Sequence, residues 1–547
     1  MRRIPGLLAT AASITWMAAA SAADMMPMPV AAAAPSDADL EAAGARIGQI
    51  HIDLGDIFDP STEGEDGALY RVANQLHIDT RKSTVRAQLL FEEGDLYSRR
   101  LLEETERNMR QLRFLTEPSV RPVAYHDGVV DVAVRARDVW TLNPGVSVGR
   151  AGGTNSVGFG IEDLNLLGTG KALALGYSAD VDRSTLLAQW RDPNVFGSRW
   201  MDEIELADSD DGYRRALTVE RPFFSLSTPW SAGLSVVSDQ HAEDRYSLGE
   251  VIDTYRVDYQ SADIHRGWSR GLEDGWARRW TAGFRYDDSV FSALPETGAA
   301  ALPEDRRLAF PYLRLELIED DFSTTRNLDQ IARTEDVHFG RRLEVQLGLA
   351  TPAWGADRTA GILSAAASRG FRFSEDQTAL VNLGLSSRIE SGGLQDALLS
   401  GAARYYWRTS PKSMLFVGLS GDVGHALDAD HDLLLGGDTG LRGYPLRYQA
   451  GSARALFTIE ERIFTDWYPF RLVNVGAAVF ADMGRTWGQD HLGTPNLGLL
   501  KDVGFGLRLG NSRSALGNVL HIDLAFPLDG DSSIRDMQIL LKTHKSF

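Results

Sequence analysis

The feature that most constrains this fold is an alternation of apolar and polar residues through residues 142–547. Aliphatic or aromatic residues take every second position in segments such as 280–286, 343–349, 503–509 and 520–526, with Gly, Arg, Glu, Gln, His or Asp between them. Successive side chains of a strand point to opposite faces, so this pattern predicts strands with one apolar and one polar face. It favours a mainly β fold, either a transmembrane antiparallel barrel or a soluble sandwich, because alternation alone does not say which face is outside.

Several further features favour the transmembrane barrel. The strand-like segments run about nine to thirteen residues, a length suited to crossing a bilayer at a tilt. Short turns such as 181–184 alternate with longer polar loops such as 321–334, as in outer-membrane barrels, and aromatic residues fall near strand ends, where interfacial girdles form. The chain also ends on Phe547, as outer-membrane barrel sequences commonly do. The alternation predicts about twenty strands, about five of them after a loop near 433–449.

The N-terminus has the three regions of a secretory signal peptide. Arg2 and Arg3 form a charged start, residues 7–20 are mostly apolar, and residues 20–22 read Ala-Ser-Ala, a cleavage site of A-x-A type. We expect residues 1–22 to be removed; the alternative is an alanine-rich helical start of a cytosolic protein. Residues 23–44, rich in Met, Pro and Ala, are interpreted as a linker. Beyond residue 22 no run approaches the ~20 apolar residues of a membrane helix, so membrane insertion would use strands.

Residues 45–140 predict a small domain with the element order β-α-α-β-β. We expect a strand near 47–52, helices at 69–76 and 98–112 with Ser98 as N-cap, and strands at 119–126 and 129–137 joined by Asp127-Gly128, a strong hairpin signal. With Glu-Gly-Asp-Leu-Tyr at 93–97 entering the second helix, this order resembles a POTRA domain, the periplasmic module that precedes certain outer-membrane barrels. Another kind of small β-α-α-β-β domain is the alternative.

The loop near 433–449 is rich in glycine and carries Arg442 near the centre of its 433–445 segment. Glycines at 436, 437, 440 and 443 let the loop fold back on itself. A buried guanidinium has five donors and keeps its charge, so it needs carboxylates nearby. Glu460 and Asp482 lie on the polar faces of the two strands that follow, and Phe480 shares its face with Asp482. Burying either carboxylate in a confined interior would cost free energy unless it is paired with a cation. Arg442 is their predicted partner.

These motifs together resemble the BamA/TamA superfamily of outer-membrane barrels, which combine POTRA domains with a bacterial surface antigen barrel. Gly440-Leu441-Arg442-Gly443-Tyr444 is similar to the V-R-G-F/Y loop motif of that superfamily, and residues 480–484, from Phe480 to Gly484, are similar to its F-x-D-x-G strand motif. Glu460 stands where the superfamily has an acidic partner. The resemblance implies that the Arg442 loop tucks into the barrel. It also implies about sixteen strands, which differs from the number that the alternation predicts.

The resemblance further implies a weak seam between the first and last strands, at which an unfolded client is inserted or exported. The first predicted strand contains Gly145 and Gly149, and the last ends at Phe547. Glycine weakens a strand, so this seam could open and offer an edge to a client strand. The alternative is that these glycines only fit the curvature of the barrel.

Composition and motifs argue against other functions. The net charge of −19 and the pI near 5.1 argue against a nucleic-acid partner. The absence of cysteine removes thiolate metal sites and cysteine nucleophiles. Residues 145–149 match the G-x-S-x-G pattern of hydrolases without the following helix, and the Asp/His run at 425–432 lacks the glycine of an EF-hand, which favours a solvated loop. We therefore expect no catalytic residues, no metal site and no cofactor.

The sequence thus predicts a bacterial outer-membrane barrel over residues 141–547 with a POTRA domain at 45–140 in the periplasm. It would insert or export client polypeptides. The expected partners are outer-membrane lipid and lipopolysaccharide, unfolded client polypeptides and periplasmic chaperones. The main alternative is a passive pore for small solutes. An outer-membrane hydrolase is disfavoured because residues 23–44 leave no room for a lipase domain.

Overall fold

The structure is a computed structural model that describes residues 35–294, 302–515, 519–532 and 534–544. The predicted signal peptide, most of the predicted linker and the terminal Phe547 lie outside the described residues.

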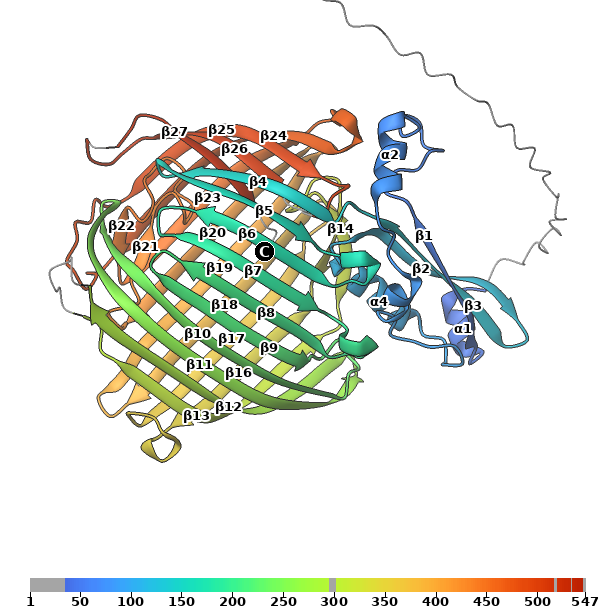
Figure 1. Ribbon diagram of the computed structural model, residues 1–547, viewed down its shortest axis with the longest axis horizontal. Helices are drawn as coiled ribbons and strands as arrows, with labels where there is room; N and C mark the ends of the chain where they lie inside the picture. The colour runs from blue at the N-terminus through green and yellow to red at the C-terminus, as the bar shows by residue number, and fades with distance from the viewer. Residues whose placement is uncertain (1–34, 295–301, 516–518, 533, 545–547) are drawn as a thin grey trace, which may run out of the picture.

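Within the described residues, twenty strands form one closed antiparallel barrel (Figure 1). Neighbouring barrel strands pair in chain order, and the last strand closes on the first. The strands are β4 (Leu142–Ala151), β5 (Thr154–Asp163), β6 (Ala172–Ala179), β7 (Ser184–Asp192), β8 (Met201–Ser209), β9 (Gly212–Arg221), β10 (Trp230–Ser247), β11 (Glu250–Glu273), β12 (Trp276–Ala293), β13 (Arg306–Glu319), β16 (Arg341–Ala350), β17 (Ala360–Arg372), β18 (Gln377–Glu390), β19 (Gly393–Ser410), β20 (Ser413–His425), β23 (Ala453–Phe464), β24 (Val473–Trp487), β25 (Leu500–Asn511), β26 (Val519–Pro527) and β27 (Gln538–His544).

The strand number predicted from alternation is confirmed, and the sixteen strands implied by the resemblance are wrong. Five barrel strands follow the glycine-rich loop, as predicted. The alternation is visible in each strand by itself, because every strand has one apolar and one polar face. The barrel motifs that carry the resemblance lie in one loop and two strands, so the expectation of sixteen strands came from the superfamily and not from residues of the preceding hairpins.

The apolar face of the barrel strands is the outer one. On β25, Val503, Phe505 and Leu507 are 39–52% exposed, whereas Arg508 on the opposite face is buried. Val146 on β4 is 80% exposed. An apolar outer wall around a polar interior is the reverse of a soluble sandwich and is the arrangement of a barrel that faces lipid. No helix in the described part of the chain is both long and apolar enough to cross a membrane.

A small domain precedes the barrel and lies at one of its ends (Figure 1). Its sheet has the order β1-β3-β2, with β1 parallel to β3 and β2 antiparallel to it. Helices pack against this sheet around one apolar core. The elements are α1 (Asp37–Ala42), β1 (Arg46–Gly55), α2 (Ala68–Leu76), α3 (Lys82–Arg86), α4 (Arg99–Gln111), β2 (Leu115–His126) and β3 (Val129–Asp138). The predicted β-α-α-β-β order is present, with α3 as an additional short helix.

Two local features of the domain differ from the sequence predictions. Residues 37–42, within the predicted linker, form α1. The side chain of Ser36 caps this helix, and Leu40 is completely buried in the domain core. Ser98 occupies the N-cap position of α4, but its side chain makes no capping hydrogen bond. The Asp127-Gly128 hairpin agrees with the prediction, because both residues have the positive φ of a tight primed turn.

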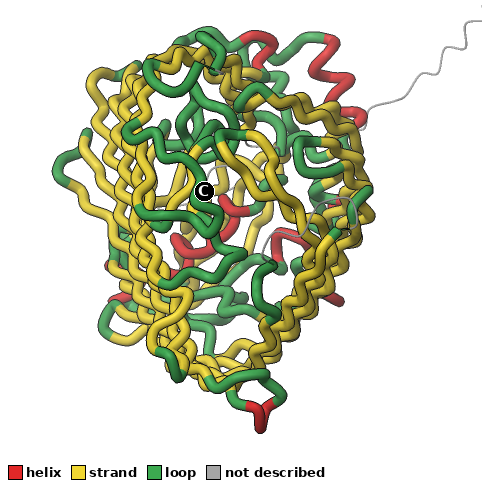
Figure 2. Tube along the Cα trace, turned by 90° about the vertical axis from the view of Figure 1, so that its left-hand side faces the viewer, coloured by secondary structure: helices red, strands yellow, loops and turns green. Residues whose placement is uncertain are grey.

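Two connections turn inward from the ends of the barrel, and Figure 2 shows loops within the ring of barrel strands. The β13–β16 connection forms a hairpin of β14 (Phe322–Arg326) and β15 (Thr334–His338). The β20–β23 connection contains β21 (Leu433–Leu435) and β22 (Gln449–Gly451). Residues 321–334, predicted as one of the longer polar loops, form part of a hairpin on the side of the domain, where Arg110 of α4 binds Asp336.

The burial of Leu40 predicts that α1 stabilises the domain. Leu40→Ala should lower the free energy of unfolding of the domain by about 2–5 kcal/mol, because the removed side chain leaves a cavity in a packed core. Faster amide hydrogen exchange in β1 and β3 of the full-length protein would show this loss. Leu69→Ala is the matched control, since Leu69 of α2 is 63% exposed; equal exchange in both variants would contradict the role of α1.

Candidate functional site

The glycine-rich loop folds back on itself and lies inside the barrel. Leu433 pairs with Gly451 and Leu435 with Gln449, and the Gly437 amide donates to the Pro445 carbonyl at 2.8 Å. Tyr444 at the tip is fully buried, and its hydroxyl donates to the Lys501 carbonyl of β25 at 2.8 Å. These contacts bring Arg442 to the polar inner face of β23–β26.

Arg442 binds both carboxylates that the sequence offered as partners. Its Nε and Nη2 donate to the two oxygens of Asp482 on β24 at 2.7 and 3.0 Å. Its Nη1 donates to Glu460 Oε2 on β23 at 2.7 Å. The guanidinium carbon lies 3.3 Å from the centre of the Phe480 ring, which packs against the cation. The structure therefore brings Arg442, Glu460, Phe480 and Asp482 together in one contact.

Glu460 is the centre of a larger charge network. Its Oε2 also accepts from Arg508 Nη2 on β25 at 3.0 Å, and its Oε1 accepts from Arg462 Nε at 2.9 Å. Arg508 in turn donates to Asp523 on β26. Glu460, Asp523 and Arg508 are each at most 3% exposed, so their charges depend on one another rather than on water.

The glycine after Arg442 is required by close approach. The Gly443 amide donates to Asp502 Oδ2 at 3.0 Å, and a Cβ at this position would lie only 2.7 Å from the Asp502 Cβ. Any larger residue would push Arg442 away from its carboxylates. Burial opposes the charge of Arg442, but Asp482 and Glu460 outweigh this effect and raise its pKa above the ordinary value. The loop therefore carries a permanent positive charge.

The remaining predicted residues lie close to this site or at the seam. Leu441 is fully buried in the loop, and Gly440 has the positive φ of +121° that glycine permits. Gly484 faces Leu435 at the base of the loop. Asp502, Arg508 and Asp523 were missed by the sequence reasoning. The alternation put Arg508 and Asp523 on polar faces, but only the folded structure shows that Arg508 binds Glu460 and that Asp523 binds Arg508.

The seam between β27 and β4 has very little registered pairing in the described residues. Leu541 and Arg150 are the single registered pair, whereas β4 and β5 share ten and β26 and β27 share seven. Gly149 lies at the seam, where an added Cβ would be 3.5 Å from the Leu541 carbonyl oxygen. Gly145 lies further along β4. Because ladder hydrogen bonds hold a barrel closed, this is the weakest junction among the strand pairs that the structure describes.

The loop contacts both sides of this seam. Lys542 Nζ of β27 donates to the Gly437 carbonyl at 2.6 Å. Gly152, in the turn after β4, packs so closely on Pro445 and Leu446 that a Cβ there would overlap the Leu446 amide. The loop that holds Arg442 therefore lies across the junction of the first and last strands.

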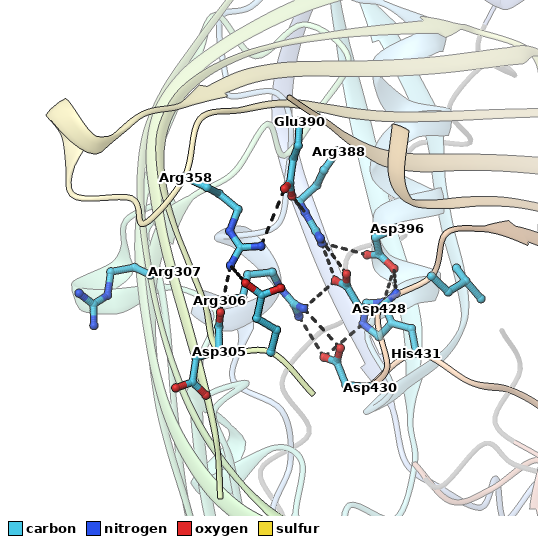
Figure 3. A network of polar contacts seen from close by, with 12 residues as sticks. Asp305, Arg306, Arg307, Arg358, Arg388, Glu390, Asp396, Asp428, Asp430 and His431 are labelled. Atoms are coloured by element: carbon cyan, nitrogen blue, oxygen red, sulfur yellow. Dashed lines mark hydrogen bonds and ion pairs between the residues drawn. The ribbon is translucent and has the colours of Figure 1, made fainter. Parts of the chain in front are cut away.

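The start of the loop lies at the end of the barrel away from the domain (Figure 1), where a second network anchors it, drawn from close by in Figure 3. Arg388 of β18 donates two hydrogen bonds of 2.6 and 2.8 Å to the carboxylate of Asp428, and Arg306 of β13 donates one of 3.0 Å to Asp430. Asp396 accepts from His431 Nδ1 at 2.7 Å. The prediction of a solvated loop at 425–432 holds only in part: His425 and His431 are exposed, whereas Asp428 and Asp430 are paired with two arginines on the inner wall.

Asp396, Asp428 and His431 lie close enough together to be considered as metal ligands. The oxygens of Asp428 already accept from Arg388 and Arg306, and Asp396 accepts from His431. A cation would have to displace arginines from these carboxylates. The donor set therefore suits an ion-pair network better than a metal centre.

A cavity of about 690 Å³ lies between the Arg442 loop and the tip of the β14–β15 hairpin. Its lining includes Asp329, Arg442, Arg462 and Lys542. The barrel interior is thus occupied from both ends, with a charged chamber between the two inserted segments.

No model of a known protein family matches the sequence, and no curated protein matches it. Solved structures similar to the chain include CdiB from Acinetobacter baumannii, with 13% identity over 91% of this chain and 74% of that one and a TM-score of 0.46. CdiB from Escherichia coli has 13% identity over 92% and 76% and a TM-score of 0.44. BamA from Haemophilus ducreyi lacking POTRA domains 1-3 has 14% identity over 91% and 84% and a TM-score of 0.37. The function is therefore inferred from the contacts of this chain.

The burial of the Arg442 pair predicts a large effect of breaking it. Arg442→Ala should destabilise the folded barrel by about 3–5 kcal/mol, because Asp482 and Glu460 would keep buried charges without this partner. Asp482→Asn should act in the same direction. The temperature at which the heat-modifiable band disappears on a gel measures the effect. Arg485→Ala on the exposed side of β24 is the control; equal temperatures for Arg442→Ala and the control would contradict the pairing.

The histidine at the start of the loop predicts a pH dependence. The hydrogen bond to Asp396 raises the pKa of His431 above 6.5. The protonated imidazole therefore stabilises the anchored loop fully below pH 6.5, and this contribution is lost as the pH rises through the raised pKa. Amide protection at residues 427–432, corrected for intrinsic exchange, should fall over that interval. His431→Gln should remove the pH dependence, and an unchanged profile in this variant would contradict it.

Proposed function

We propose that this chain is a bacterial outer-membrane barrel of the BamA/TamA type that inserts or exports client polypeptides through the β4–β27 seam. Residues 45–140 would act as a POTRA domain in the periplasm. The observation that carries this proposal is a seam with one registered pair among the described residues, crossed by a loop whose arginine is fixed in the wall. Association with lipopolysaccharide and periplasmic chaperones stays a prediction from the sequence.

The seam supplies what strand addition requires. A strand whose neighbour pairs with it at a single position leaves backbone donors and acceptors along its edge for another strand. A client segment in extended conformation can satisfy these groups by β-augmentation. The Arg442 loop, which touches Gly152 and Lys542, would hold the two edges near each other until a client replaces their contact.

The contents of the barrel argue against a passive pore. A barrel of twenty strands is wide enough for a water-filled channel. Here the Arg442 loop and the β14–β15 hairpin enter it from opposite ends and meet the same cavity. A steady, high conductance of the purified wild-type protein in a planar bilayer, without insertion of clients into liposomes, would support the pore instead.

A disulfide across the seam should block the proposed activity. The chain has no cysteine, so Arg150→Cys with Leu541→Cys, at the registered positions, creates one defined pair. Oxidised protein should lose client insertion into liposomes, and reduction should restore it, because a covalent link keeps the seam closed.

The matched control places the disulfide elsewhere in the wall. Leu313→Cys with Leu347→Cys links β13 to β16 at registered positions whose side chains also face outward. This link should leave client insertion intact. Full activity of the oxidised seam variant would contradict the seam mechanism.

A further inference from the structure

The β14–β15 hairpin is an insertion into the barrel on the side of the N-terminal domain. Its two strands pair only with each other within the described residues and form a separate two-stranded sheet. It leaves the wall between β13 and β16, and its tip, residues 327–333, reaches β19, β23 and β25 farther round the barrel. The hairpin therefore crosses the mouth of the barrel without joining the ladder of the wall.

Side chains fix the tip of this hairpin in the interior. Asp329 accepts from Arg404 Nη1 at 3.0 Å and from the Tyr406 hydroxyl at 2.9 Å, both on β19. Leu328 and Ile331 are buried, and Ile331 packs against Gly510 of β25. Glu335 accepts from the Leu328 and Asp329 amides at 2.8 and 3.0 Å, so the tip keeps its shape through its own bonds.

The base of the hairpin is held by the N-terminal domain. Arg110 of α4 forms a bidentate ion pair with Asp336 of β15: its Nε and Nη2 donate to the two carboxylate oxygens at 2.8 and 2.7 Å. Both side chains are less than 20% exposed. Arg107, one turn earlier on the same helix, places its guanidinium 3.8 Å from the centre of the Phe322 ring of β14. Helix α4 of the domain thus contacts both strands of the hairpin.

The tip also shares a residue with the Arg442 site. Arg462 of β23 donates through Nη1 to the Leu328 carbonyl and through Nε to Glu460, the carboxylate that binds Arg442. The hairpin and the Arg442 loop are consequently connected by one arginine and one glutamate. A change in the position of the tip would alter the charges around Arg442.

We propose that the β14–β15 hairpin is a gate at the domain-side mouth of the barrel, which the N-terminal domain holds shut through Arg110 and Asp336. A polypeptide that binds the domain and shifts α4 releases the hairpin and opens the interior. The hairpin can leave as a unit, because its own ladder and the Glu335 bonds stay intact while only side-chain contacts to the wall break. This inference rests on the proposed function for the identity of that polypeptide, but the gate itself requires only the barrel.

Planar-bilayer conductance of the full-length protein tests the gate without any client. Arg110→Ala and, separately, Asp336→Asn should raise the ratio of open to closed time about tenfold or more, because each removes a bidentate charge-assisted contact. Arg99→Ala is the control on the same helix, since Arg99 pairs within the domain with Glu103. Its conductance should equal that of the wild type.

A reversible disulfide provides the second arm. Ile331→Cys with Gly510→Cys joins the tip to β25, because Ile331 packs directly on Gly510. An ideal Cβ on Gly510 lies 2.9 Å from the Ile331 Cβ, so the tip must move out by about 1 Å to reach the ~3.8 Å of a disulfide. In the Arg110→Ala background, oxidation should return conductance to the wild-type level and reduction should raise it again. Wild-type conductance in both Arg110→Ala and Asp336→Asn, or raised conductance that oxidation leaves unchanged, would overturn the gate.

The client assay separates this inference from the proposed function. If the wild type inserts no client while Arg110→Ala still raises conductance, the gate is supported and the proposed assembly function is contradicted. If the wild type inserts clients and the oxidised tip lock has no effect on insertion or conductance, the gate falls and the assembly function stands.

Discussion

The structure depends on one buried cation. Arg442 leaves water when its loop folds into the barrel, and that cost is recovered only if carboxylates meet it with good geometry. Asp482 and Glu460 do so from neighbouring strands, and Arg508 and Asp523 extend the pairing across four strands of the wall. The loop, the register of β23–β26 and the closed barrel are therefore mutually dependent, since a slip of one residue would turn the carboxylates toward lipid.

The width of the barrel explains why so much chain lies inside it. The diameter of a barrel grows with its strand number, and twenty strands leave an interior that wall side chains alone do not fill. Two insertions occupy it, one anchored by the Arg306 and Arg388 network and one by Arg110 of the domain. Each is held mainly by arginine–carboxylate pairs, which are directional and can be exchanged for other charged partners. Interior segments held in this way are suited to a barrel that must open.

Sequence reasoning succeeded where a local signal was sufficient. The period of two in the barrel strands is a consequence of one lipid-facing side, and it is readable in each strand by itself. Arg442, Glu460 and Asp482 were predictable because a charge on an inward face needs a counter-charge. The hairpin at 322–338 was not, because a polar connection between strands has the same composition whether it lies outside or inside the barrel. The burial of Leu40 was equally hidden in a stretch that resembles a linker.

The sequence by itself determined the antiparallel barrel, its strand number, the small mixed domain and the identity of the buried arginine with two of its carboxylates. The tertiary structure decided which end each connection occupies, that the Arg442 loop touches both seam strands, and that Arg110 of the domain reaches Asp336 inside the mouth. The physical reason is the sequence separation over which each interaction acts. Alternation and charge compensation act between neighbours along a strand or across one ladder, whereas the seam and the gate join residues separated by hundreds of positions, whose meeting is set only when the barrel closes.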